Sequence, residues 1–533
     1  MIVGLGMAAA LAFSAQDPKA AAAAAPTEQS SVAYIDINDV PPAVREPTEA
    51  EYAEIERLVG RAEGARDAER FDEAIEAATE LAALSAATFG PRHPITASCL
   101  NIIGQVKFDQ GDYDGAEAIF RDGLAIRVAA LGEIHPDVAE SLNNIAGVLS
   151  RRGLNAQALV FLQQAVDVWT QVGTFDRNLA DGLANLANQY SYLGRYAEAE
   201  VPARRAVAVT EKIYDADDPE TAGNFGTLGE ILLALGKYEE AEGYLSAADR
   251  VFVASGKAHT LKAGLTLSRL GTLRNYQGRY GDAADLFRRS TEVFAAAVGP
   301  DHVFTGAALV SAGQAMLLDG RPERAETLLR RGLRVQEKQL GLDHQDTATT
   351  RMILAQALLA LGQVEQADAL SRRSVMDLER KLGADAQNTA SARVVHASVL
   401  MVEGENALAE RESRRALAAL GGILSADHPQ VSDARSNLAR ALLAQGRAME
   451  AEAVLSPALT LTSSAFGQGH PGAIELQTQL ARSLLAQSRL AAAMEASRSS
   501  VSPLVLSAPA LRRQRQLERV RVEAAWLNSR SGA

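Results

Sequence analysis

The chain has 533 residues, a net charge of −13 and 47% hydrophobic residues, of which few are aromatic. This composition supports a packed core, and only 17 prolines leave room for long helices. The negative charge repels phosphate backbones and so excludes nucleic acid as a general partner. The one cysteine, Cys99, excludes an intrachain disulfide and a cysteine metal site. It lies in an apolar stretch and is expected to be a small buried hydrophobe.

Residues 1–15 are apolar and rich in small side chains. This segment is too short to form a stable membrane span. It fits the hydrophobic region of a signal peptide, although no Lys or Arg precedes Lys19. If it is a signal peptide, the protein is exported to the periplasm or secreted; otherwise it is an Ala-rich leader of a cytoplasmic protein. Residues 16–47, first Ala-rich and then Pro-containing, are expected to be a disordered linker.

From residue 48 onward the sequence repeats with a period of 42 residues. One glycine recurs at this period. Successive members are 42 residues apart, except for Gly153 and Gly194, which are 41 apart. The series is Gly111, Gly153, Gly194, Gly236, Gly278, Gly320, Gly362, Gly404 and Gly446, with Glu69 at its beginning and Ser488 at its end. Such a glycine is expected in a tight turn between two helices, where a positive φ is accessible to Gly.

Small residues recur at fixed distances from this turn. All eleven positions five residues after it are Ala, and all eleven positions seven residues before it are Gly or Ala. These positions are expected where paired helices cross, because a larger side chain would push the helix axes apart. An aromatic residue two positions after the turn is expected to fill the space beside them; examples are Phe71, Tyr113, Tyr196, Tyr238 and Tyr280.

A second glycine, 21 residues after the turn, is expected to cap the second helix of each pair; Gly299 is one example. His-Pro or Asp-Pro often follows, as at His135-Pro136, and proline suits the first position of a helix. Each unit is therefore helix A, turn, helix B and loop, and the first helix A covers about residues 50–66. The units fill residues 48–507. Residues 508–533 are expected to hold an Arg-rich capping helix, over 508–528, and a tail.

The turn glycine, the aromatic residue two positions later, the alanine five positions later and the small residue seven positions earlier resemble the tetratricopeptide repeat pattern. The 42-residue period and the segment from Leu131 to Ala146 resemble the kinesin light chain type of that repeat, here in a bacterial style. The resemblance implies an all-α, right-handed α-solenoid of about eleven helix pairs plus a C-terminal capping helix. It also implies a concave face lined by the A helices, on which a peptide or protein segment binds.

The positions nine and six residues before the turn glycine are expected to point into this groove, and two further Asn residues lie on the same face. Asn and Gln are modest or poor helix formers, and their amides can both donate to and accept from a peptide backbone. The predicted binding residues are Gln105, Asn143, Asn144, Asn185, Asn188, Glu230, Arg269, Asn275, Gln314, Gln356, Asn437, Arg440 and Arg482. Arg440 and Arg482 suggest that the C-terminal groove takes an acidic segment.

The sequence offers no constellation for catalysis. Seven of the eight histidines lie in loops, mostly at the repeat period, so their spacing is architectural and no metal site is expected. His396 occupies an apolar position of a helix A and is expected to be a core histidine with one hydrogen bond. No phosphate-binding loop, His-Glu-x-x-His motif or nucleophile elbow occurs. We therefore predict no catalytic residue and no cofactor.

The favoured function is a non-enzymatic scaffold or adaptor that binds a protein or an extended peptide segment, with no nucleic acid and no stable membrane span. Two alternatives stay open. One is a cytoplasmic regulator that senses a peptide through a change in superhelix pitch, and the other is a structural subunit of a larger assembly.

Overall fold

The computed structural model describes residues 48–173, 175–215, 217–426, 428–468 and 471–497, together with residues 519–521, 523, 524 and 527. The expected signal peptide and linker, residues 1–47, lie outside the described residues, as does most of the expected capping helix, 508–528. The described residues belong to two compact units, one ending at Ser255 and the other beginning at Gly256. We call them the N-terminal unit and the C-terminal unit.

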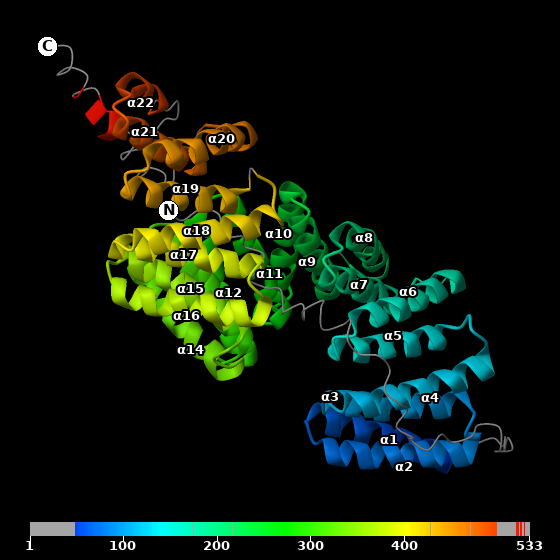
Figure 1. Ribbon diagram of the computed structural model, residues 1–533. Helices are drawn as coiled ribbons and strands as arrows, with labels where there is room; N and C mark the ends of the chain where they lie inside the picture. Colours follow the sequence, from blue (N-terminus) through cyan, green and yellow to red (C-terminus); the bar gives the residue numbers. More distant parts are fainter. Residues whose placement is uncertain are drawn as a thin grey trace. The chain divides into compact units, whose positions relative to one another are not determined.

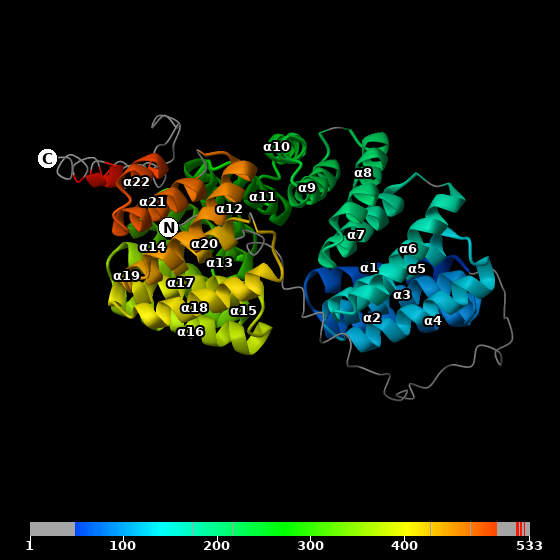
Figure 2. The ribbon, with the colours of Figure 1, turned by 45° about the horizontal axis from the view of Figure 1, so that its top comes forward.

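The N-terminal unit consists of five antiparallel helix pairs stacked in chain order (Figures 1 and 2). Its A helices are α1 (Glu49–Asp67), α3 (Pro94–Asp109), α5 (Pro136–Arg151), α7 (Arg177–Tyr192) and α9 (Pro219–Ala234). Its B helices are α2 (Phe71–Phe89), α4 (Tyr113–Leu131), α6 (Asn155–Val172), α8 (Tyr196–Ile213) and α10 (Tyr238–Ala254).

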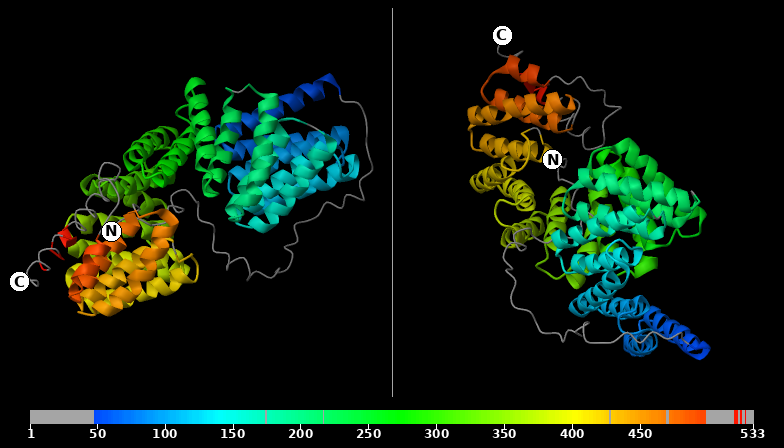
Figure 3. Two further views of the ribbon diagram at one scale, coloured as in Figure 1. Left: turned by 90° about the horizontal axis from the view of Figure 1, so that it is seen from above. Right: turned by 90° about the vertical axis from the view of Figure 1, so that its right-hand side faces the viewer.

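The C-terminal unit contains six further pairs among its described residues, coloured green to orange in Figure 3. Its A helices are α11 (Leu261–Tyr276), α13 (Val303–Leu318), α15 (Gln345–Ala360), α17 (Gln387–Glu403), α19 (Pro429–Ala444) and α21 (Pro471–Ala486). Its B helices are α12 (Tyr280–Val298), α14 (Pro322–Gln339), α16 (Val364–Leu382), α18 (Asn406–Gly421), α20 (Ala448–Phe466) and α22 (Leu490–Ala496). The prediction of an all-α solenoid built from helix pairs is confirmed.

The turn between the two helices of a pair has the predicted backbone conformation. The nine turn glycines have φ between +71° and +86°. Glu69 and Ser488, which stand at the two ends of the series, adopt the same conformation with φ of 55° and 58°. They are the only non-glycine residues with positive φ in the described part of the chain. The packing of the two helices therefore fixes a positive φ at the turn, even where the residue has a side chain that disfavours it.

The small residues lie at the helix crossing, as predicted. Every alanine five residues after the turn, from Ala74 to Ala493, is completely buried. The glycines seven residues before the turn face a large side chain of helix B: a Cβ on Gly271 would lie 2.9 Å from the ring of Phe287, and a Cβ on Gly313 would lie 2.7 Å from Leu329.

The prediction about the aromatic residues is confirmed only in part: Phe71 packs against a cluster that contains Ala74, and Tyr113 against one that contains Ala116. Tyr238 is 37% exposed and the other four are only half-buried, because each of these residues begins a helix B at the edge of the pair. The space beside the small residues is also filled by the side chain nine positions after the turn, such as Phe287.

The loop after helix B is closed by side chains of the next helix A. Gly299 caps α12, as predicted, with φ 98° and ψ 156°, a region open to Gly alone. Its carbonyl oxygen accepts the hydroxyl of Thr305 at 2.8 Å. Five of the seven loop histidines are N-caps: Nδ1 accepts a backbone N–H two residues later at 3.2 Å in His93, His135, His302, His344 and His428. Their periodic spacing is thus architectural, as predicted.

Consecutive A helices lie closer to one another than consecutive B helices do. Within the N-terminal unit this holds for α5, α7 and α9, and within the C-terminal unit for the A helices from α13 to α21. The A helices therefore line the inner, concave side of each stack. Among the described helices, none combines the length and the apolar character that crossing a bilayer requires.

Candidate functional site

Hydrogen-bonded asparagines connect three consecutive A helices on the inner side of the N-terminal unit. Asn144 on α5 donates from Nδ2 to Oδ1 of Asn101 on α3, at 2.9 Å. Asn185 on α7 donates from Nδ2 to Oδ1 of Asn143 on α5, at 3.1 Å. Asn101 in turn donates to Oε1 of Glu140 at 3.2 Å. We call Asn101, Asn143, Asn144 and Asn185 the amide ladder.

The amide ladder keeps part of its hydrogen-bonding capacity unused. An asparagine amide has two N–H donors and a carbonyl oxygen with two lone pairs, and the ladder bonds engage only a fraction of them. Among the described residues, Oδ1 of Asn144 and Nδ2 of Asn143 have no protein partner. Asn185 is exposed, and the half-buried Asn188, almost one helical turn further along α7, makes no side-chain hydrogen bond in the described structure. The ladder bonds hold Asn143, Asn144 and Asn185 in place and leave part of their hydrogen-bonding capacity to a ligand.

Sequence reasoning identified three members of the ladder and missed Asn101. The available signal was its repeat position: Asn101 and Asn143 both lie ten residues before their turn glycine. The other two predicted residues of this unit are half-buried. Gln105 is engaged within the protein, because its Oε1 accepts Nη1 of Arg66 at 2.7 Å. Glu230 lies on α9, where its charge contributes to a raised pKa of Tyr196, whose main cause is burial.

The predicted residues of the C-terminal unit do not form such a ladder. Arg269, Gln314 and Gln356 are half-buried on three different A helices. Asn275 is 4% exposed, and neither of its amide atoms has a hydrogen-bond partner among the described residues. It stands where most other A helices carry an apolar or hydroxyl side chain. Asn275 is therefore a part of the packed interior and not of an open face.

Asn437 is also used by the fold. It is 3% exposed, and its Nδ2 donates to the backbone oxygen of Val394 and to Oγ of Ser398, both at 2.9 Å. It thus joins α19 to α17. Arg440 is half-buried, and burial lowers its pKa, while the neighbouring Glu475 favours its charged form. Arg482 is exposed on α21. Because Glu475 is buried beside Arg440, the cationic character expected of this face is partly neutralised within the protein.

His396 agrees with its prediction as a core histidine. It lies on α17, and its Nδ1 is 3.0 Å from Oγ of Ser371 on α16. Burial lowers the pKa of the imidazole, with the charge of Asp368 opposing this effect. Ser371 and Asp368 both approach the same nitrogen, so the three residues do not have the relay geometry of a hydrolase triad.

The repeats match a known family. One profile of the tetratricopeptide repeat family matches residues 53–129, 102–171, 137–212, 178–248 and 263–338, which together span more than half of the chain. A second profile of that family matches residues 401–466. The chain therefore belongs to the tetratricopeptide repeat family. A comparison with curated protein sequences gives no match.

Solved structures resemble the chain in fold. The crystal structure of a Podosopora anserina putative kinesin light chain with nearly identical TPR-like repeats is 21% identical, with 42% of this chain and 97% of that chain covered and a TM-score of 0.32. The apo form of RapI is 14% identical, with 54% and 98% covered and a TM-score of 0.43. The apo form of the quorum sensor NprR from B. thuringiensis is 12% identical, with 70% and 99% covered and a TM-score of 0.50.

Proposed function

We propose that the protein is a non-enzymatic scaffold or adaptor, and that the N-terminal unit binds an extended segment of a partner protein along α3, α5 and α7. The observation that carries this proposal is the amide ladder, which fixes polar amides on consecutive A helices while leaving donors and acceptors unused. An extended peptide presents backbone N–H and C=O groups at regular intervals, which such amides can pair. Because the ladder already holds the side chains, binding costs less conformational entropy.

The charges around the ladder are mostly balanced inside the protein. Arg127 is 3% exposed, and it reaches Glu140 at 3.4 Å and the backbone oxygen of Asp137 at 2.8 Å. Arg177 on α7 lies 3.4 Å from Asp181 and 3.6 Å from Glu220. The face is therefore polar without a dominant charge. This favours recognition of a partner's backbone over recognition of a particular charged side chain.

The proposal is tested with the full chain as bait in a native extract, comparing wild type with a variant that combines Asn143→Ala, Asn144→Ala and Asn185→Ala. Captured proteins are identified by mass spectrometry, and the affinity of the most enriched one is then measured. Each lost amide contact costs about 1 kcal/mol, so the triple variant should bind about a hundredfold more weakly.

The matched control removes amides from the outer face of the same unit. Gln164 and Gln171 are exposed on α6, and the variant with Gln164→Ala and Gln171→Ala should bind like wild type. Circular dichroism checks that both variants keep their helix content. If the ladder variant captures the same proteins with the same affinity as wild type, the binding face lies elsewhere.

A further inference from the structure

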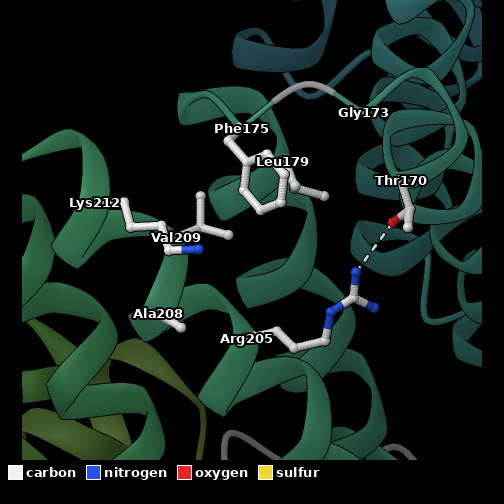
Figure 4. A pocket seen from close by; sticks show the side chains of 8 residues that line it. All are labelled: Thr170, Gly173, Phe175, Leu179, Arg205, Ala208, Val209 and Lys212. Carbon is white, nitrogen blue, oxygen red and sulfur yellow. Dashed lines mark hydrogen bonds between the residues drawn. The ribbon is translucent and has the colours of Figure 1, made fainter.

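A cavity separate from the amide ladder lies at the edge of the N-terminal unit, between the end of α6, the start of α7 and the side of α8 (Figure 4). Its volume is about 130 Å³. Leu179, Val209 and Ala208 supply its apolar lining, and the ring of Phe175 lies over it in Figure 4. A cavity of ~150 Å³ with an apolar lining is large enough to bind benzene.

The cavity coincides with the one irregularity in the repeat. The turn glycines Gly153 and Gly194 are 41 residues apart, whereas all other successive turn glycines are 42 apart. In this unit α6 ends at Val172, and Gly173 adopts the left-handed conformation directly after it, with φ 77° and ψ 20°. The previous unit instead continues α4 to Leu131 before its glycine cap.

Two cations at the cavity lack an acidic partner. Within the described part of the chain, neither Arg205 nor Lys212 has a carboxylate within 4.0 Å. Arg205 donates from Nη2 to Oγ1 of Thr170 at 3.1 Å, and Nζ of Lys212 lies 4.9 Å from the centre of the Phe175 ring. The adjacent Arg204 behaves differently, since it reaches Glu200 at 2.8 Å and Glu240 at 2.6 Å. Arg205 and Lys212 thus bring two positive charges without a carboxylate partner to one cavity, in a chain of net charge −13.

The mouth of the cavity also exposes apolar surface. Phe175 is 61% exposed, and Val172, at the end of α6, is 36% exposed. An exposed phenylalanine beside a concave apolar surface is typical of a ligand-binding position. Apolar lining and unpaired positive charge thus occur at the same place.

We propose that this cavity binds an apolar group that carries a carboxylate, with the apolar part against Leu179 and Val209 and the carboxylate between Arg205 and Lys212. This chemistry occurs in a small aromatic or aliphatic acid, and also in an apolar residue at the free C-terminus of a peptide. The site is distinct from the amide ladder, so it stands or falls independently of the proposed function.

The test uses phenylacetate as the probe and phenylacetamide as its neutral match. The full chain carries Trp526→Phe, which leaves Trp169 as its single tryptophan. Trp169 is 1% exposed on α6 and directly precedes Thr170 of the cavity, so its fluorescence reports binding. Phenylacetate should bind at least tenfold more tightly than phenylacetamide, and added salt should weaken it. Equal binding of the two probes, or no binding of either, would overturn the proposal.

Substitutions then assign the site. Arg205→Gln and Lys212→Gln should each weaken phenylacetate binding by about tenfold, because each removes a charge-assisted hydrogen bond. The control Arg331→Gln changes an exposed arginine at the same repeat position on α14, outside the residues that line this cavity, and should leave binding unchanged. A loss of binding in that control equal to the loss in Arg205→Gln would count against the site.

One further variant fills the cavity without touching its charges. Ala208 is exposed at the cavity edge, so Ala208→Leu should fold normally and yet exclude phenylacetate. Unchanged binding in this variant contradicts the proposal.

The source of the ligand is identified by comparing phenylacetate with a heptapeptide that ends in Phe, either as the free acid or as the amide. Tighter binding of the acid peptide than of phenylacetate indicates a chain terminus, and the reverse order indicates a small acid.

Discussion

Single residues in this protein are governed by their repeat position more than by their own preferences. Glu69 shows this most clearly, since it adopts φ 55° at a place where the following nine units have glycine. A left-handed conformation costs a residue with a side chain about 1–2 kcal/mol. The neighbouring helices α1 and α2 hold the turn in this conformation through their packing.

We predict that Glu69→Gly stabilises the protein by about 0.5–1 kcal/mol, because it removes the left-handed strain against a smaller entropic cost of glycine. The free energy of unfolding in urea measures the effect. The matched control is Glu63→Gly, the same substitution at an exposed position inside α1, which should destabilise by about 1 kcal/mol. Equal signs for the two substitutions would refute the role assigned to the turn.

Two asparagines of the inner face show that the same repeat position does not guarantee the same exposure. Asn185 and Asn437 both lie nine residues before a turn glycine, and the sequence treats them alike. Asn185 is exposed on α7, whereas Asn437 is buried and bonded to α17. The difference arises from how closely consecutive A helices approach, and that distance depends on packing over several helices.

At the scale of the elements, each helix pair is held by a small residue of helix A against a large residue of helix B. Gly104 faces Phe120, Gly229 faces Leu245, and Gly271 faces Phe287. The close approach of the two helices removes apolar surface from water along their whole contact. The identity of the large side chain varies between pairs, so the contact is conserved in volume and not in residue type.

We predict that Gly271→Ala destabilises the protein by about 1–3 kcal/mol, because its methyl group would overlap the fully buried ring of Phe287. Adding Phe287→Leu should recover part of this loss, since a smaller side chain frees space at the crossing. Thermal unfolding of wild type and these two variants measures the effect.

The control is a glycine of helix A that meets no neighbour. Gly147 on α5 is exposed, and a Cβ there would have nothing within 4 Å. Gly147→Ala should therefore stabilise by about 1 kcal/mol through helix propensity alone. A destabilising Gly147→Ala, or a neutral Gly271→Ala, would contradict the assignment of Gly271 to the crossing.

At the scale of the whole molecule, the contacts of a helix are confined to its near neighbours along the chain. Within each unit, a described helix packs on the helices before and after it, and several A helices also meet the next A helix. Among the residues that the structure describes, the core is divided into several buried clusters, one of which runs from Ala116 to Val209. Stability in such an array is a sum over units and their interfaces, so cooperative unfolding is limited in range.

We predict that the variant with Trp526→Phe unfolds in guanidinium chloride with transitions that differ between two probes. Trp169 fluorescence reports the N-terminal unit alone, whereas circular dichroism reports all helices. The two curves should not superimpose, because distant units unfold at different denaturant concentrations. Superimposable curves with one midpoint would show that the whole array unfolds as a single cooperative unit.

The sequence by itself determined the helix pairs, the turn glycines, the buried alanines and the architectural role of the loop histidines. These features depend on backbone geometry and on contacts between residues close in the chain, which a fixed period exposes directly. Only the tertiary structure decided which polar residues of the inner face pair with one another, which are buried, and that a cavity between α6, α7 and α8 lies beside two cations without a carboxylate partner. Those outcomes depend on side chains about 42 residues apart and on the spacing of neighbouring helices, which no local pattern specifies.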